Sequence, residues 1–112
     1  MSRGILPAGR ERRAAATFAA LGDATRLRLV GRLSSGAAYS ITQLAEGTPL
    51  TRQAVTKHLR TLEGAGLVRC EQRGRERVFA LEAARLAEMR EYLAGISAVW
   101  DKRLARLKSV VE

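Results

Sequence analysis

The segment 51–64 could place base-reading side chains on one face of a helix. With about 100° per residue, Leu59 and Leu62 lie within about 40° of Val55 and form an apolar stripe. The opposite side, at about 140° to 200°, holds three polar or basic residues and no acid: Gln53, Lys57 and Arg60. This pattern predicts a helix that is buried on one side and faces a polyanion on the other.

These side chains suit contacts with double-stranded DNA. A glutamine amide can pair bidentately with adenine, and an arginine guanidinium can pair in the same way with guanine. Threonine can contact a phosphate or the methyl group of thymine. The DNA contacts that we predict from this segment are Thr51, Arg52, Gln53, Thr56, Lys57 and Arg60.

A second basic group surrounds Gly74. Two runs with strand character, 67–72 and 77–81, flank this glycine and predict a β-hairpin. Arginine at a hairpin tip can enter a narrow, electronegative minor groove. We therefore predict DNA contacts from Arg73, Arg75 and Arg77.

The charge of the chain also indicates a polyanionic partner. Lysine and arginine number 20 of the 112 residues against 11 acids, which gives a formal charge of +9. This balance favours a nucleic acid or an anionic membrane surface. The excess of arginine over lysine favours bidentate recognition of phosphate and guanine, although a GC-rich genome produces the same bias.

Few residues could support catalysis or bind a metal. His58 is the only histidine and Cys70 the only cysteine, so the sequence has no Cys-x-x-Cys motif and no histidine cluster. No nucleophile–base pair, carboxylate pair or phosphate loop is evident. We expect no enzymatic activity, no cofactor and no metal, with His58 and Cys70 in packing roles.

Four helices are expected before the hairpin. The first spans 11–21 and ends at Gly22 as a C′ residue, and the second follows an Asp23 cap with Leu27, Val30 and Leu33 on its buried stripe. Ser40 and Gln43 form a predicted capping box for a short third helix, and Thr51 caps the fourth.

A long helix is expected after the hairpin, over 83–111. Its apolar residues recur every three or four positions, and a helix this long would leave them in water unless a partner covered them. We predict a homodimer interface made by the first and last helices, with Phe18, Met89, Leu93, Ile96, Trp100, Leu104 and Leu107.

These elements predict a mainly α fold with a small β-hairpin, a winged helix-turn-helix. Residues 1–10 are expected to be a flexible arm, and 11–112 a single domain. Within it, 11–21 and 83–111 are the predicted dimerisation helices, 40–66 the helix-turn-helix and 67–81 the wing.

Three stretches resemble the ArsR/SmtB family of bacterial repressors. LGDATRLRLVGRL resembles the family's second helix, TRQAVTKHLRTLEGAGLVR its recognition helix and RGRERVFAL its wing, so the likeness runs from about Phe18 to Leu81. The resemblance implies a winged helix homodimer that represses transcription from an operator with dyad symmetry. It also implies an effector whose binding weakens that of DNA.

The sequence departs from the family's metal sensors. Some of them carry Cys-x-Cys on the third helix, where this chain has Ser40-Ile41-Thr42, and others use Asp and His on the last helix, where it has no histidine. Neither metal site can be carried over, so the chain resembles a branch without metal-site motifs, and any effector would be an unidentified small molecule.

Two alternative functions predict different surfaces. A nonspecific or architectural nucleic-acid-binding protein would need only the basic surface, whereas a protein-interaction module would favour a mixed or apolar helix face. No signal peptide or membrane-spanning segment is evident in the sequence, which predicts a cytoplasmic, nucleoid-associated protein without membrane contact.

Overall fold

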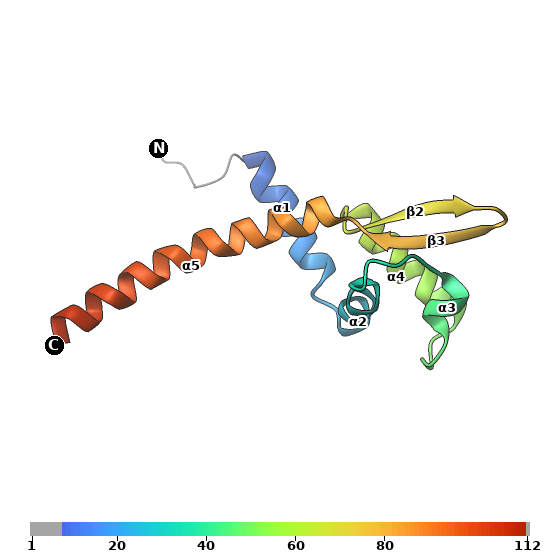
Figure 1. Ribbon diagram of the computed structural model, residues 1–112, viewed down its shortest axis with the longest axis horizontal. Helices are drawn as coiled ribbons and strands as arrows, with labels where there is room; N and C mark the ends of the chain where they lie inside the picture. Colours follow the sequence, from blue (N-terminus) through green and yellow to red (C-terminus); the bar gives the residue numbers. More distant parts are fainter. Residues whose placement is uncertain (1–7, 112) are drawn as a thin grey trace.

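The computed structural model describes residues 8–111. The chain order is α1 (Ala8–Ala20), α2 (Ala24–Leu33), β1 (Tyr39–Ser40), α3 (Ile41–Ala45), α4 (Arg52–Gly64), β2 (Val68–Arg73), β3 (Glu76–Leu81) and α5 (Ala83–Val111). Helices α2, α3 and α4 gather beside the hairpin, and α5 crosses α1 and then projects away from the other elements (Figure 1). This is the predicted mainly helical, winged helix-turn-helix architecture.

Three predicted helix caps are confirmed. The Asp23 side chain accepts from the backbone N–H of Arg26 at 3.0 Å, and that of Thr51 accepts from Ala54 at 3.0 Å. Ser40 and Gln43 form the reciprocal capping box at the start of α3. Each cap satisfies N–H groups that the first turn of a helix leaves without a partner.

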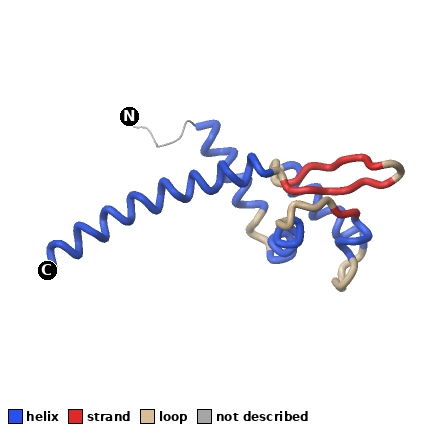
Figure 2. The backbone as a smooth tube through the Cα atoms, viewed as in Figure 1, coloured by secondary structure: helices blue, strands red, loops and turns tan. Residues whose placement is uncertain are grey.

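A three-stranded antiparallel sheet, in the order β1-β3-β2, contains the hairpin (Figure 2). Gly74, at φ 61°, makes the turn between β2 and β3, and Val68 pairs with Leu81 at the other end of the ladder. Strand β1 was not predicted. It has two residues, too few for an alternating pattern, and it forms only because the edge of β3 is available.

The core lies where α2, α3 and α4 meet the sheet. Its members include a single aromatic residue, Phe79, and are Ala20, Leu29, Leu33, Leu44, Val55, Leu59, Leu62, Leu67, Val68, Phe79 and Met89. Burying each large side chain contributes roughly 1.5–3 kcal/mol. This packing holds α4 in place and leaves its polar side free.

Three details of the helix predictions are wrong. Helix α1 begins at Ala8, so residues 8–10 belong to the helix and not to the predicted arm, whose first seven residues lie outside the described part of the chain. Leu27 is 55% exposed, and Leu29 takes its place in the core. Gly22 follows α1 without the left-handed conformation expected of a C′ glycine.

Candidate nucleic-acid interface

Helix α4 presents the predicted polar face to solvent. Val55, Leu59 and Leu62 are fully buried, so the other side of the helix, with Gln53, Lys57 and Arg60, faces outward. Thr56 is half-buried, and its hydroxyl donates to the carbonyl of Arg52 at 2.8 Å. The methyl group and lone pairs of Thr56 therefore remain for contacts outside the chain.

A shallow groove runs between α3 and the start of α4. It is lined by Ile41, Arg52, Gln53 and Thr56. Ile41 was not among the predicted site residues. Its position directly after the Ser40 cap could have indicated it, because the first turn of α3 lies beside the start of α4. The groove thus combines an apolar wall with three polar predicted contacts.

A polar cluster ties α4 to α2. Arg26 donates to the carbonyl of Ala20 at 2.6 Å, and its Nη1 lies 3.4 Å from Nδ1 of His58. His58 thus lies beside a guanidinium from α2. Asp23 is 3.9 Å from the same nitrogen. His58 therefore has the hydrogen-bonded packing role that we predicted.

The hairpin carries its arginines in two different states. Arg73 is paired with Glu71 at 3.1 Å, and Arg69 is paired with Glu71 at 2.9 Å. The hydrogen bonds from Arg69 and then Arg73 hold the pKa of Glu71 below its usual range. Within residues 8–111, Arg75 and Arg77 are exposed and form no ion pair. Thus Arg75 and Arg77 are available to a ligand, whereas Arg73 must first leave Glu71.

The predicted DNA contacts lie on two neighbouring elements. All nine are exposed except Thr56, and α4 packs against β2 at the base of the hairpin. The hairpin extends beyond α3 and α4 (Figure 1). A helix face and a projecting basic hairpin can together follow a duplex from one groove to the next.

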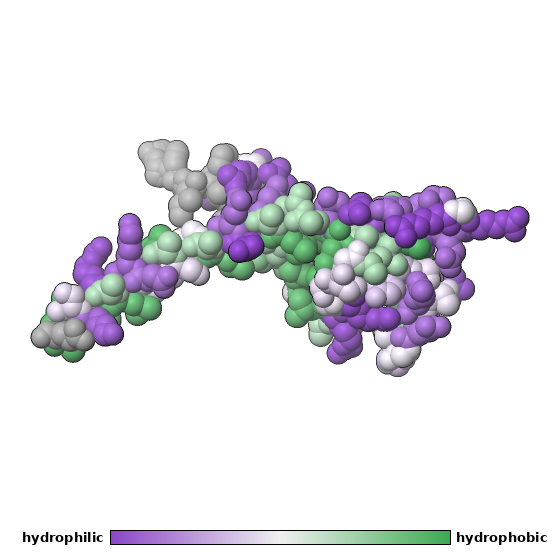
Figure 3. Space-filling model, in the orientation of Figure 1, coloured by the Kyte–Doolittle hydropathy of each residue, from purple (hydrophilic) through white to green (hydrophobic). Residues whose placement is uncertain are grey.

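The predicted dimer residues fall into two groups. Leu93, Ile96, Trp100, Leu104 and Leu107 are exposed, in contrast to the core. Figure 3 shows apolar surface along α5 and around its crossing with α1, whereas the hairpin tip is hydrophilic. Met89 instead is buried within its own chain, and Phe18 is half-buried with its ring 5.9 Å from that of Tyr92. Met89 therefore does not belong to the exposed apolar surface.

Among residues 8–111, no three His, Cys, Asp or Glu side chains are grouped so that they could hold a metal ion. In the same part of the chain, no helix has the length and apolar character needed to cross a bilayer. Cys70 is half-buried on β2 opposite Phe79.

Known proteins match this chain both in sequence and in structure. A family model described as a helix-turn-helix domain matches residues 21–71. The HTH-type transcriptional regulator Rv2034 of Mycobacterium tuberculosis is 32% identical over 93 residues, which cover 83% of each protein. The structure of an ArsR-like transcriptional regulator from Rhodococcus sp. RHA1 is 38% identical, with a TM-score of 0.78, and the match covers 93% of this chain and 97% of that one.

The chain belongs to the ArsR family. It is therefore a transcriptional regulator with a helix-turn-helix DNA-binding domain. A winged helix-turn-helix fragment from Mycobacterium bovis, described as homodimeric, has the same fold at 18% identity, with a TM-score of 0.65 over 94% of each chain. CmtR of Mycobacterium bovis is 43% identical over 68 residues, 61% of this chain and 57% of that protein.

The ArsR-family match extends beyond the helix-turn-helix. Residues 21–71 run from the end of α1 into β2, whereas the Rhodococcus structure also covers most of the remaining chain. The polar face of α4 lies inside the matched segment, and Arg73, Arg75 and Arg77 follow it on the hairpin. The α5 surface lies outside the helix-turn-helix match.

Proposed function

We propose that this ArsR-family protein is a homodimeric repressor that binds an operator of dyad symmetry. The observation that carries the proposal is the exposed face of α4, where Gln53, Lys57 and Arg60 form a surface without acids. In a winged helix-turn-helix, a helix in this position enters the major groove. Arg75 and Arg77 would then reach the adjacent backbone or minor groove.

Sequence-specific binding explains this face better than nonspecific binding does. A protein that needs only positive charge gains nothing from Gln53, which has an amide suited to adenine. Its side chain is exposed at the groove wall beside Ile41 and Arg52. The architectural alternative predicts equal affinity for all duplexes at a given salt concentration, because phosphate contacts carry no sequence information.

The homodimer is supported by the apolar surface of α5. Trp100 and Leu107 are 56% and 61% exposed, and the helix projects from the rest of the chain. Full burial of a large apolar side chain contributes roughly 1.5–3 kcal/mol, and covering the exposed part of five such side chains on each of two copies would offset the cost of association. Two copies related by a dyad would present two α4 helices to half-sites about one helical turn apart.

The proposal includes regulation and place of action. An operator that overlaps a promoter would make the bound dimer a repressor, and the family resemblance adds a small molecule whose binding weakens that of DNA. Such a protein would act in the cytoplasm, at the nucleoid.

Selection of genomic fragments by the purified protein tests the proposal. We expect a few promoter fragments to be retained, and footprints on them to show two symmetric half-sites. Placing such a fragment upstream of a reporter should lower expression when the protein is present. Equal retention of random and genomic duplexes would support the architectural alternative, and raised expression would contradict repression.

A further inference from the structure

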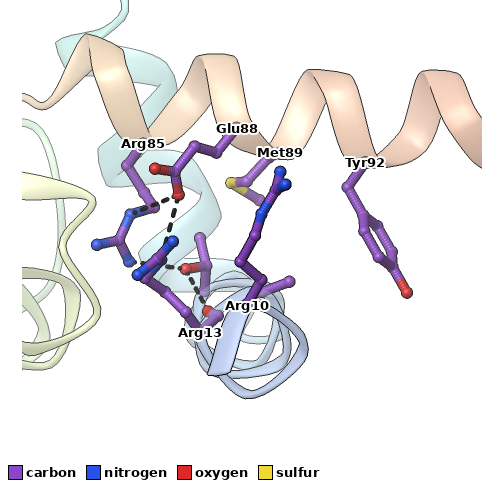
Figure 4. A pocket seen from close by; sticks show the side chains of 8 residues that line it. Arg10, Arg13, Arg85, Glu88, Met89 and Tyr92 are labelled. Carbon is purple, nitrogen blue, oxygen red and sulfur yellow. Dashed lines mark hydrogen bonds and ion pairs between the residues drawn. The ribbon is translucent and has the colours of Figure 1, made fainter. Parts of the chain in front are cut away.

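A cationic pocket lies between α1 and α5, away from the candidate DNA interface. Arg10 and Arg13 point into it from α1, and Arg85 and Glu88 from α5 (Figure 4). None of its lining residues comes from α3, α4 or the hairpin. Three guanidinium groups thus face a single carboxylate, which gives the pocket a formal charge of +2 from these four residues.

Arg85 is held rigidly in this pocket. Its Nη1 donates to the hydroxyl of Thr17 at 3.2 Å and to the carbonyl of Ala65 at 2.7 Å. Its guanidinium also lies against Gly66, 2.7 Å from the place that a Cβ there would occupy. Because Thr17 is fully buried, the anchoring hydroxyl is itself fixed. A ligand would therefore meet a preorganised guanidinium, at little cost in side-chain entropy.

Glu88 fills the space between two arginines only loosely. Its Oε1 is 3.4 Å from Nε of Arg13 and 3.5 Å from Nε of Arg85. Charge-assisted hydrogen bonds between such groups are ordinarily about 2.7–2.9 Å long. Two guanidiniums thus converge on one carboxylate oxygen without a close bond to it. The side chain of Arg10 forms no hydrogen bond or ion pair within residues 8–111.

We propose that this α1–α5 pocket binds a small dianion, either a phosphate monoester or a dicarboxylate. The formal charge of +2 on these four residues is complementary to the charge of a dianion. The enclosed space measures only about 20 Å³, room for about one water, so a compact head group would enter by displacing Glu88, while Met89 and Tyr92 line the side along which an organic portion would lie. Arginine forks match both phosphate and carboxylate oxygens bidentately. The proposal rests on this geometry and not on the DNA-binding function.

Calorimetric titration of the DNA-free protein tests the site. Inorganic phosphate, phenyl phosphate, succinate and acetate are titrated separately, with chloride added to keep the ionic strength constant. We expect saturable binding of one dianion per chain and weaker binding of acetate. Tighter binding of the phosphates or of succinate identifies which of the two dianion sources the site accepts. Absence of saturable binding, or equal binding of acetate, would overturn the proposal.

Variants separate a built site from general positive charge. Arg10→Ala and Arg13→Ala should each weaken dianion binding about tenfold, because a charge-assisted hydrogen bond is lost. Arg12→Ala and Arg90→Ala remove the same charge from exposed positions on the same two helices, outside the pocket lining. These two controls, and Arg60→Ala on the DNA face, should bind as the wild type does.

Glu88→Gln provides a test with the opposite sign. It keeps the shape of the side chain and removes the carboxylate that competes for Arg13 and Arg85, so dianion affinity should rise. If these pairs only join α1 to α5, the variant should lower stability without raising affinity. That result, or equal weakening by Arg12→Ala and Arg13→Ala, would contradict the proposal.

Discussion

The guanidinium of Arg85 occupies the space that a side chain at Gly66 would need. Gly66 has φ +80°, and a Cβ on it would lie 2.7 Å from the Arg85 guanidinium carbon. Two requirements therefore meet at one residue, a left-handed turn after α4 and room for an arginine from α5. Because Arg85 also bonds Thr17, this contact joins α1, the α4–β2 turn and α5.

Replacing Gly66 should destabilise the fold. We expect Gly66→Ala to lower the free energy of unfolding by about 2 kcal/mol, since the left-handed conformation alone costs about 1–2 kcal/mol and Arg85 must move as well. Urea unfolding at one fixed protein concentration measures the change. Gly31→Ala, at a helical glycine with open space around it, should instead stabilise by about 0.5–1 kcal/mol. If Gly66→Ala left the free energy of unfolding unchanged, that result would contradict the described turn.

Stability should depend on pH through Asp23. The hydrogen bond from the backbone N–H of Arg26, with the positive charge of Arg26, lowers the pKa of Asp23 below its ordinary value of 3.8. Since the folded state favours the charged form, the contribution of Asp23 is present above the unfolded pKa and is lost as the pH falls through the folded one.

The variant Asp23→Asn isolates this effect. Asparagine caps a helix about as well as aspartate but does not titrate, so the variant should lose less stability than the wild type in acid. Thermal unfolding between about pH 5 and pH 2 gives the comparison. Asp101→Asn, at an exposed position on α5, should keep the wild-type profile. Identical profiles for Asp23→Asn and the wild type would show that stability depends on the side-chain oxygen that accepts the capping hydrogen bond, and not on its charge.

On α4, Arg60→Ala should weaken operator binding by about 1–3 kcal/mol if Arg60 reads a guanine, and should relax specificity at one base pair. If Arg60 contacts a phosphate, affinity should fall equally for all sequences. Lys57→Ala serves as the neighbouring test, and Arg12→Ala on α1 as the charge control. Competition binding against single-base operator variants distinguishes these outcomes. Unchanged binding by both α4 variants would rule out the proposed docking of α4.

In the hairpin, Arg75→Ala should reduce DNA affinity and lower the salt dependence of binding by about one unit in the logarithmic slope. Arg69→Ala removes the same charge from the same hairpin, but Arg69 is occupied by Glu71, Glu82 and the carbonyl of Leu81. It should therefore change DNA binding less. Affinities measured across a range of salt concentrations give both slopes, and equal effects would mean that the hairpin contributes only overall charge.

On α5, Ile96→Glu combined with Trp100→Glu should produce a monomer or an unfolded chain, with operator binding lost. A charge in each of two contact positions cannot be buried against the second copy without a large penalty. Light scattering at low micromolar concentration reports the mass, and Lys102→Glu, about 200° around the helix from Trp100, is the matched control. A wild-type mass near 12.2 kDa with specific DNA binding intact would contradict the dimer.

Local sequence patterns determined the elements of the DNA-binding unit. The caps at Asp23, Ser40 and Thr51 act over three residues, so they could be identified without knowledge of the fold. The same holds for Gly74, and for the 3.6-residue period that separates Val55 from the polar face of α4. These features depend on neighbours within one helix or turn, which is why the sequence alone predicted the α4 face and the hairpin.

Only the tertiary structure decided which apolar side chains are buried and which polar groups meet. Leucine at 27, 29 and 33 covers a wide arc of α2, and packing against α4 and β3 selected Leu29 and Leu33. Strand β1 exists because β3 offers it an edge, and Met89 is buried because α5 lies there against Ala14 and Thr17 of α1. The cationic pocket brings together Arg10 and Glu88, which are far apart in the sequence. Such contacts depend on how elements distant in sequence pack together, and no local pattern encodes that packing.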